Sequence, residues 1–272
     1  MRLVAFFLWE TSLCHNVTGH VLQLRLRSFF PVGDEFSTDD DQWGAQYEAY
    51  RRSRFGGKIN PSLLDLKHLI YLDLSGNNFN GTQIPKFLGS MGSLRYLNLS
   101  NAGFGRLIPH QLGNLSNLHY LNLGDNNLYV MNLQWLSGLP LLQYLDLSSN
   151  NFSGSIPASI GSLINLESLH LYKNKFSGKL LSLLKNCKDL LTIDIGENEF
   201  VGSIPKWIGH RLSSLMILSL HSNNFYGQIS DEICDHINQY FDDFYMIFDL
   251  VNTSNQANCT FVHRSPIWVL RN

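Results

Sequence analysis

The sequence predicts an α/β repeat solenoid, a horseshoe whose concave face is one parallel β-sheet. Two observations predict this fold. A leucine pattern recurs about every 24 residues, and an asparagine followed by an aromatic residue recurs in step with it. A unit of this length cannot bury its own apolar face, so neighbouring units must stack and pair their strands in parallel.

The leucine pattern is L-x-x-L-x-L, and seven copies lie between residues 69 and 220. Leucines at spacing two lie on one face of a strand, so both point into the core and the side chains that flank them point to the concave surface. Successive central positions are 24 or 25 residues apart, which indicates one strand in each repeat. The central residues are Leu72, Leu97, Leu121, Leu145, Leu169, Ile193 and Leu218.

Two further columns follow each predicted strand. An asparagine lies five residues after the central position in six of the seven copies, where an inward amide can pair backbone groups that the turn leaves open. Ala102 replaces it in the second copy, which predicts a local loss in this ladder. Seven residues after the central position, six phenylalanines and Leu128 predict a second apolar column.

Composition and motifs exclude several function classes. A net charge of -2 with 15% charged residues argues against a nucleic-acid-binding surface. The sequence has no phosphate-binding glycine loop, no H-E-x-x-H, no G-x-S-x-G and no kinase signature, and its ten histidines are scattered. It therefore predicts no enzyme, no catalytic residue, no metal site and no cofactor. It contains no apolar run of about 18 residues, so no transmembrane segment is predicted.

The second half of several repeats identifies a subtype. Residues 154–163 and 202–209 carry G-S-I-P followed by I-G, and Ile84-Pro85 and Ile108-Pro109 carry the same I-P pair. These segments resemble the plant-specific leucine-rich repeat, L-x-G-x-I-P-x-x-L-G-x-L. Upstream, C-H-N-V-T-G-H-V at residues 14–21 looks like the end of an N-terminal cap. The chain is therefore similar to plant leucine-rich-repeat receptor-like proteins of the disease-resistance, elicitor-receptor type.

This resemblance implies a leucine-rich-repeat horseshoe that serves as an extracellular ligand-recognition scaffold in defence or developmental signalling, without its own catalytic domain. The implied partners are a peptide or protein ligand and membrane receptor kinases that act as co-receptors. The implied location is extracellular or at the plasma membrane. Two alternatives stay open: a secreted inhibitor resembling polygalacturonase-inhibiting proteins, and the truncated ectodomain of a receptor kinase.

The chain divides into four predicted parts. Residues 1–13 are either a truncated signal peptide or a mis-started N-terminus. Residues 14–68 form a partial cap and first strand, interrupted at 28–54 by an acidic, solvated loop. Seven repeats occupy 69–235, and the tail at 236–272 lacks repeat spacing. This tail is either an improvised cap or off-frame sequence, and we interpret the whole as a fragment of an ectodomain.

Candidate ligand-binding residues lie on the predicted concave face, whose composition changes along the ladder. The first four repeats place a tyrosine at one position of each strand, which indicates aromatic stacking and supplies secondary binding candidates. From the fifth repeat, histidine, tyrosine and charges of both signs take over, as in protein-recognition surfaces. The secondary candidates are Tyr71, Tyr96, Tyr120 and Tyr144, and the primary candidates are His170, Tyr172, Lys173, Asp194, Glu197 and His221.

Seven N-x-S/T sequons suggest a glycosylated, secretory protein. Asn98 lies within a predicted strand, where a glycan would obstruct the concave face, so it is set apart from the other six. Cys187 occupies the slot of Leu115 and Leu163 in sister repeats, which predicts a buried thiol, and a Cys234–Cys259 bridge rests on no spacing rule. The predicted glycosylation sites are Asn16, Asn80, Asn114, Asn151, Asn252 and Asn258.

Overall fold

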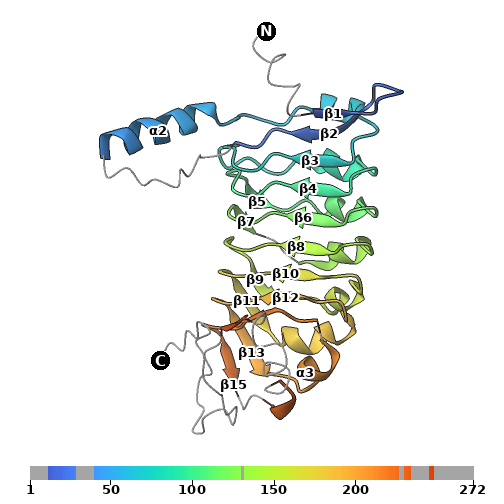
Figure 1. The fold of residues 1–272 in the computed structure, drawn as a ribbon, viewed down its shortest axis with the longest axis vertical. Coiled ribbons are helices and arrows are strands. Elements are labelled where there is room, and N and C mark those ends of the chain that lie inside the picture. Colours follow the sequence, from blue (N-terminus) through green and yellow to red (C-terminus); the bar gives the residue numbers. More distant parts are fainter. Residues whose placement is uncertain are drawn as a thin grey trace.

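Leucines two residues apart bring the short strands into one sheet, which forms the spine of the molecule (Figure 1). The strands stack along the long axis of the solenoid, as the repeat spacing predicts. The α/β repeat solenoid with a parallel sheet is therefore confirmed. The computed structural model describes residues 12–28, 40–129, 132–212, 214–226, 230–233 and 245–247.

Ten strands form the concave sheet within the described residues, in the order β1-β2-β3-β4-β6-β8-β10-β12-β14-β16. The first pair, β1 and β2, is antiparallel, and every later pair is parallel. Central residues of neighbouring repeats are register partners, as Leu72 and Leu97 are. The strands are β1 (Ser12–Cys14), β2 (Val21–Arg25), β3 (Tyr71–Asp73), β4 (Tyr96–Asn98), β6 (Tyr120–Asn122), β8 (Tyr144–Asp146), β10 (Ser168–His170), β12 (Thr192–Asp194), β14 (Ile217–Ser219) and β16 (Tyr245–Ile247).

The return path of each repeat forms a second layer that the leucine pattern does not predict. Short parallel strands form a four-stranded sheet in the later repeats and a two-stranded sheet earlier: β9 (Ser153–Ser155), β11 (Lys175–Gly178), β13 (Glu199–Ser203) and β15 (Asn224–Tyr226), then β5 (Gly105–Leu107) and β7 (Asn127–Tyr129). Short helices complete the repeats: η1 (Pro61–Asp65), η2 (Lys86–Ser90), η3 (His110–Asn114), η4 (Gln134–Gly138), η5 (Ala158–Ser162), η6 (Leu180–Asn186) and α3 (Trp207–Arg211).

The core lies between these layers and is continuous along the solenoid. The predicted inward leucines are buried, including Leu97, Leu121 and Leu145, which have no exposed surface. The predicted phenylalanine column is confirmed, because Phe79 and Phe104 stack at 4.6 Å between ring centroids. Since each repeat buries its apolar face against the next, the stability of the fold depends on contacts between neighbours.

The predicted asparagine ladder is also present. In Asn126, Nδ2 donates to the carbonyls of Leu99 and Leu123 at 2.9 and 3.0 Å, and Oδ1 accepts from the Phe104 amide at 2.9 Å. The amide therefore joins two repeats. Ala102 interrupts the ladder as predicted, but the amide of Phe79 donates instead to the Ala102 carbonyl at 2.8 Å. A backbone hydrogen bond thus replaces one of the hydrogen bonds that an asparagine at position 102 would form.

The insertion in the cap repeat differs from the prediction of a solvated loop over 28–54. Residues Asp40–Ser53 form helix α2, which projects from the N-terminal end of the solenoid (Figure 1). Acidic residues at its start and Arg51 and Arg52 in its last turn complement the helix dipole, which an apolar-periodicity test does not detect. Its end is anchored on the first repeats: Tyr50 Oη donates to the Gly76 carbonyl at 3.3 Å, and the Arg54 guanidinium donates to the carbonyls of Asn77 and Asn101.

The predicted tail contains a strand that the leucine spacing does not indicate. β16 pairs in parallel with β14, and Met246 is the register partner of Leu218. Met246 lies 28 residues after Leu218, beyond the usual interval, and no L-x-L marks it. The concave sheet therefore gains a rung within residues 236–272.

Candidate ligand-binding face

The first four repeats carry a tyrosine stack on the concave face. Ring centroids of Tyr71, Tyr96, Tyr120 and Tyr144 are 3.9, 4.1 and 4.3 Å apart in succession, with interplanar angles of 8 to 10°. The Arg25 guanidinium lies 5.0 Å from the Tyr71 ring and extends the stack toward the cap, a contact that the spacing of leucines does not reveal. Burial, followed by the hydrogen bond with Tyr71, raises the pKa of Tyr96 above its ordinary range, so this hydroxyl stays neutral.

The polar side chains next to these tyrosines form hydrogen bonds within their own repeats. Asp146 Oδ1 accepts from the backbone amide of Ser148 at 2.8 Å and also from its hydroxyl. Asn98 accepts from Ser100 in the same way, at 3.0 and 2.8 Å. These polar side chains of the first repeats therefore form their hydrogen bonds with one another. Asn98 is half-buried in this arrangement, which agrees with its separation from the other sequons.

In the fifth to seventh repeats, the equivalent positions of the concave face carry different side chains. Tyr172 and His221 occupy the same position in the fifth and seventh repeats, with one repeat between them. Their ring centroids nevertheless lie only 5.9 Å from each other. The rung between them carries Gly196, and a Cβ atom there would lie 2.4 Å from His221 Cε1. The absence of a side chain at Gly196 therefore lets the two rings lean together over β12.

This cluster is held by hydrogen bonds between side chains. Tyr172 Oη donates to Glu197 Oε1 at 2.8 Å, and His221 Nδ1 lies 3.1 Å from the Ser219 hydroxyl. Gly196 and Ser219 also belong to this cluster, and neither is among the binding residues that the sequence predicts. Three of the predicted binding residues, Tyr172, Glu197 and His221, are thus brought together.

The remaining candidates border this cluster. His170 is the register partner of Asp194 and lies 5.2 Å from the Tyr144 ring, at the end of the tyrosine stack. Asp194 Oδ1 is shielded from solvent and has no hydrogen-bond partner among the described residues. In the first, second and fourth repeats a serine hydroxyl donates to the equivalent oxygen, but the residue two positions on is Gly196 here. Lys173 is exposed at the turn, with a φ of 56°.

The described sequons and cysteines lie away from this cluster. Asn16, Asn80, Asn114 and Asn151 are exposed and outside the concave strands, whereas Asn252 and Asn258 lie outside the described residues. Cys187 has no exposed surface, which confirms the predicted buried thiol, and burial raises its pKa to about 11. Cys14 is free and exposed. The Cys234–Cys259 pair also lies outside the described part of the chain.

Two features are absent from the described residues. Their histidines, cysteines and carboxylates gather in no group of three or more that could hold a metal ion. None of their helices has both the length and the apolar character needed to cross a membrane. What the concave face offers is an extended, shallow array of aromatic, polar and charged groups.

Comparison with known proteins identifies the repeat and its relatives. Leucine-rich-repeat families match residues 68–91, 92–152 and 165–187. Over 131 residues the chain is 37% identical to the receptor-like protein EIX1 of Solanum lycopersicum, and over 96 residues it is 38% identical to EIX2 of the same plant. The chain is a leucine-rich-repeat region of the plant receptor-like protein type. The matches cover 48% and 35% of the chain but only 12% and 8% of those relatives.

Solved structures support the same conclusion for the fold. The ectodomain of the Arabidopsis thaliana membrane receptor kinase GASSHO1/SCHENGEN3, in complex with CASPARIAN STRIP INTEGRITY FACTOR 2, superimposes with a TM-score of 0.64 at 30% identity, covering 72% of this chain and 24% of that one. The Arabidopsis receptor kinase HAESA, in complex with the peptide hormone IDA and the co-receptor SERK1, gives 0.67 at 26% identity, covering 88% and 39%. This leucine-rich-repeat region therefore has the fold of plant receptor ectodomains.

Proposed function

We propose that this region is the ligand-recognition surface of an extracellular plant receptor-like protein, and that a peptide or protein segment binds across β10, β12 and β14. The observation that carries the proposal is the cluster of Tyr172, Glu197 and His221 around Gly196. On the first four repeats, by contrast, the polar groups satisfy one another. A change from a uniform tyrosine stack to a cluster of aromatic, charged and histidine side chains on one rigid sheet supports a recognition patch.

The patch contains complementary groups for a peptide. Asp194 places a carboxylate on β12, between its register partners His170 and Ser219, where its negative charge can attract a cationic group of the ligand. The Tyr172 ring offers rigid apolar area at low entropic cost, and Lys173 and Glu197 supply opposite charges at the rim. The peptide hormone in the HAESA complex supports a ligand of this class.

Signalling requires a partner in this proposal. This region is a binding scaffold, and we propose that membrane receptor kinases act with it as co-receptors, in defence or developmental responses. The HAESA complex with SERK1 supports this kind of assembly. The exposed asparagines of four sequons lie outside the concave strands, so glycans attached there would leave the patch open.

The test is selection of peptides from a phage-displayed random library on the folded domain, followed by affinity measurement with single synthetic peptides. We expect the Y172A/H221A double variant to weaken binding by about tenfold or more, as loss of a buried aromatic anchor does. The matched control is Y129A/H210A, which removes an exposed tyrosine and an exposed histidine outside the concave strands. Equal affinity in both double variants would contradict the proposal.

A glycine pair sharpens the test without removing any candidate side chain. Gly196→Ala places a Cβ atom against the His221 ring and separates it from Tyr172, so we expect weaker peptide binding. Gly124→Ala changes the same column on the tyrosine-stack side, where the nearest atoms lie at 3.1 Å. Binding that survives G196A but fails in G124A would place the ligand on the first four repeats instead.

A further inference from the structure

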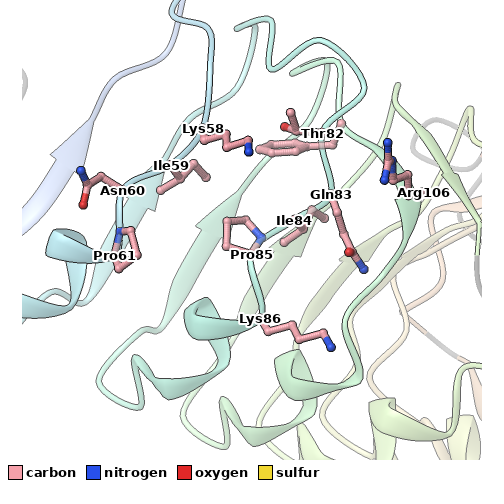
Figure 2. A pocket seen from close by; sticks show the side chains of 11 residues that line it. Lys58, Ile59, Asn60, Pro61, Thr82, Gln83, Ile84, Pro85, Lys86 and Arg106 are labelled. Atoms are coloured by element: carbon pink, nitrogen blue, oxygen red, sulfur yellow. The ribbon is translucent and has the colours of Figure 1, made fainter.

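A pocket lies on the flank of the solenoid, between the cap repeat and the first two full repeats (Figure 2). Its volume is about 680 Å³, and none of its lining residues belongs to a concave strand. The walls come from residues 58–61, residues 82–86, Phe104 and Arg106. It is therefore separate from the proposed recognition patch.

The charges around this pocket have one sign. Lys58, Lys86 and Arg106 line it, and no aspartate or glutamate does. All three cations are exposed, and none forms an ion pair with another described residue. Lys58 and Arg106 lie on opposite sides of the pocket, and Lys86 lies at its lower margin in Figure 2. Within a chain of net charge -2, this is a local positive field.

Arg106 stands at a position that the fold reserves for glycine. Its φ is 69°, and the equivalent residues of four other repeats, Gly81, Gly154, Gly178 and Gly202, also have positive φ. A side chain in this conformation costs backbone energy, and such residues are retained where the side chain serves a purpose. Here the strained residue supplies one of the three cations of the pocket.

Apolar side chains form part of the floor of the pocket, together with the polar Asn60, Thr82 and Gln83. In Figure 2 Pro85 lies between Lys58 and Lys86, Ile59 and Pro61 lie on the cap-repeat side, and Ile84 is buried. A bare inorganic anion leaves such a floor uncovered, whereas an apolar side chain next to a carboxylate covers it. We propose that this pocket binds an acidic peptide segment in which a large apolar side chain lies beside the carboxylates.

The test uses a fluorescein-labelled synthetic peptide of alternating glutamate and leucine, titrated with the whole chain at low salt. Arg106→Gly removes one cation and relieves the strained backbone, so it weakens binding by about fivefold while the melting temperature stays the same or rises. Lys58→Gln with Lys86→Gln weakens binding by about tenfold. The matched control, Lys175→Gln with Lys188→Gln, removes two exposed cations outside the pocket and leaves binding unchanged.

Two companion peptides define the ligand class. A glutamine–leucine peptide loses the charges, a glutamate–serine peptide loses the apolar contact, and both bind more weakly than the glutamate–leucine peptide. The proposal is overturned if R106G and K58Q/K86Q bind as the unchanged chain does, or if the glutamine–leucine peptide binds equally well. Displacement of the peptide by polygalacturonate at equal carboxylate concentration, with tighter binding of that polymer, would contradict the peptide class.

Discussion

At the scale of single residues, the recognition patch depends on a missing side chain. Gly196 leaves space on β12 into which His221 and Tyr172 lean, and the same glycine removes the hydroxyl that would satisfy Asp194. One residue thus permits the aromatic contact and leaves the Asp194 oxygen without a hydrogen-bond partner among the described residues. In three of the four tyrosine-stack repeats, a serine at the equivalent position donates its hydroxyl to the polar side chain two residues before it, as Ser148 does to Asp146. Gly124 takes this position in the third repeat.

Cys187 gives a residue-scale prediction on pH dependence. Burial raises the pKa of its thiol from 9.0 to about 11, so the folded state holds the proton more tightly than the unfolded state. The stabilisation is complete below pH 9.0 and is lost as pH rises toward about 11. We expect urea unfolding between these pH values to show a steeper loss of stability in the unchanged protein than in Cys187→Ala.

The comparison with Cys187→Ala also controls for the titration of the tyrosines. Burial raises the pKa of Tyr96 and Tyr144, and both residues contribute equally to the two proteins. The cavity that C187A leaves lowers stability by about 1 kcal/mol at every pH, so only the difference in slope is informative. Parallel pH profiles for the two proteins would show that the Cys187 thiol is not desolvated in the folded state.

At the scale of the repeat, the ladder asparagines and the helix glycines fix contacts between neighbouring repeats that the packing of leucines does not specify. The ladder amides pair carbonyls at the strand ends. At the opposite end of the repeat, a Cβ atom at Gly161 would lie 2.5 Å from the Leu183 carbonyl oxygen of the next repeat. These two contacts set how closely successive repeats approach.

Asn150 tests the ladder. Its Nδ2 donates to the carbonyls of Leu123 and Ser148 at 3.0 and 2.9 Å, and its Oδ1 accepts from the Leu128 amide at 3.0 Å. Asn150→Ala leaves these backbone groups unpaired, so we expect the free energy of unfolding to fall by about 2–4 kcal/mol in urea. Asn165→Ala, which removes one exposed bond to the Pro140 carbonyl, should cost less than about 1 kcal/mol. Equal losses in the two variants would refute the proposed role of the ladder.

Gly161 tests the close approach between helical turns. Gly161→Ala should lower the melting temperature, because overpacking against the Leu183 carbonyl costs about 1–3 kcal/mol. Gly92→Ala is the control, since nothing lies within 4 Å of its added Cβ atom. A differential scanning measurement that finds both variants equally stable would mean that the repeats can separate at no cost.

At the scale of the whole molecule, the solenoid is nearly one-dimensional, so its period shows in the sequence. Each repeat contacts its neighbours, and the same columns of leucine, asparagine and phenylalanine recur along the chain. Strand positions, core residues and the direction of the concave side chains could therefore be predicted from spacing alone. The interruption of the ladder at Ala102 could be predicted in the same way.

Features outside the period could not be predicted from spacing. Helix α2 lies in a charge-rich insertion outside the leucine repeat, and Tyr50 and Arg54 anchor its end by donating to backbone carbonyls that lie 23 to 47 residues further along the sequence. β16 joins the sheet at an irregular interval. At the recognition patch, spacing places Tyr172, Glu197 and His221 on one face. Their convergence depends on Gly196, whose role appears only when the side chains are placed.

The most direct test of the recognition face is site-specific photo-cross-linking of a peptide selected on the domain. A benzophenone amino acid is introduced in place of Tyr172, and in separate proteins in place of Tyr120 and Tyr129, and each is irradiated with the bound peptide. Tyr172 lies in the patch, Tyr120 in the middle of the stack, and Tyr129 on β7. The account predicts a cross-link from position 172 and none from position 129. Cross-linking at position 120 or 129 without any at position 172 would contradict it.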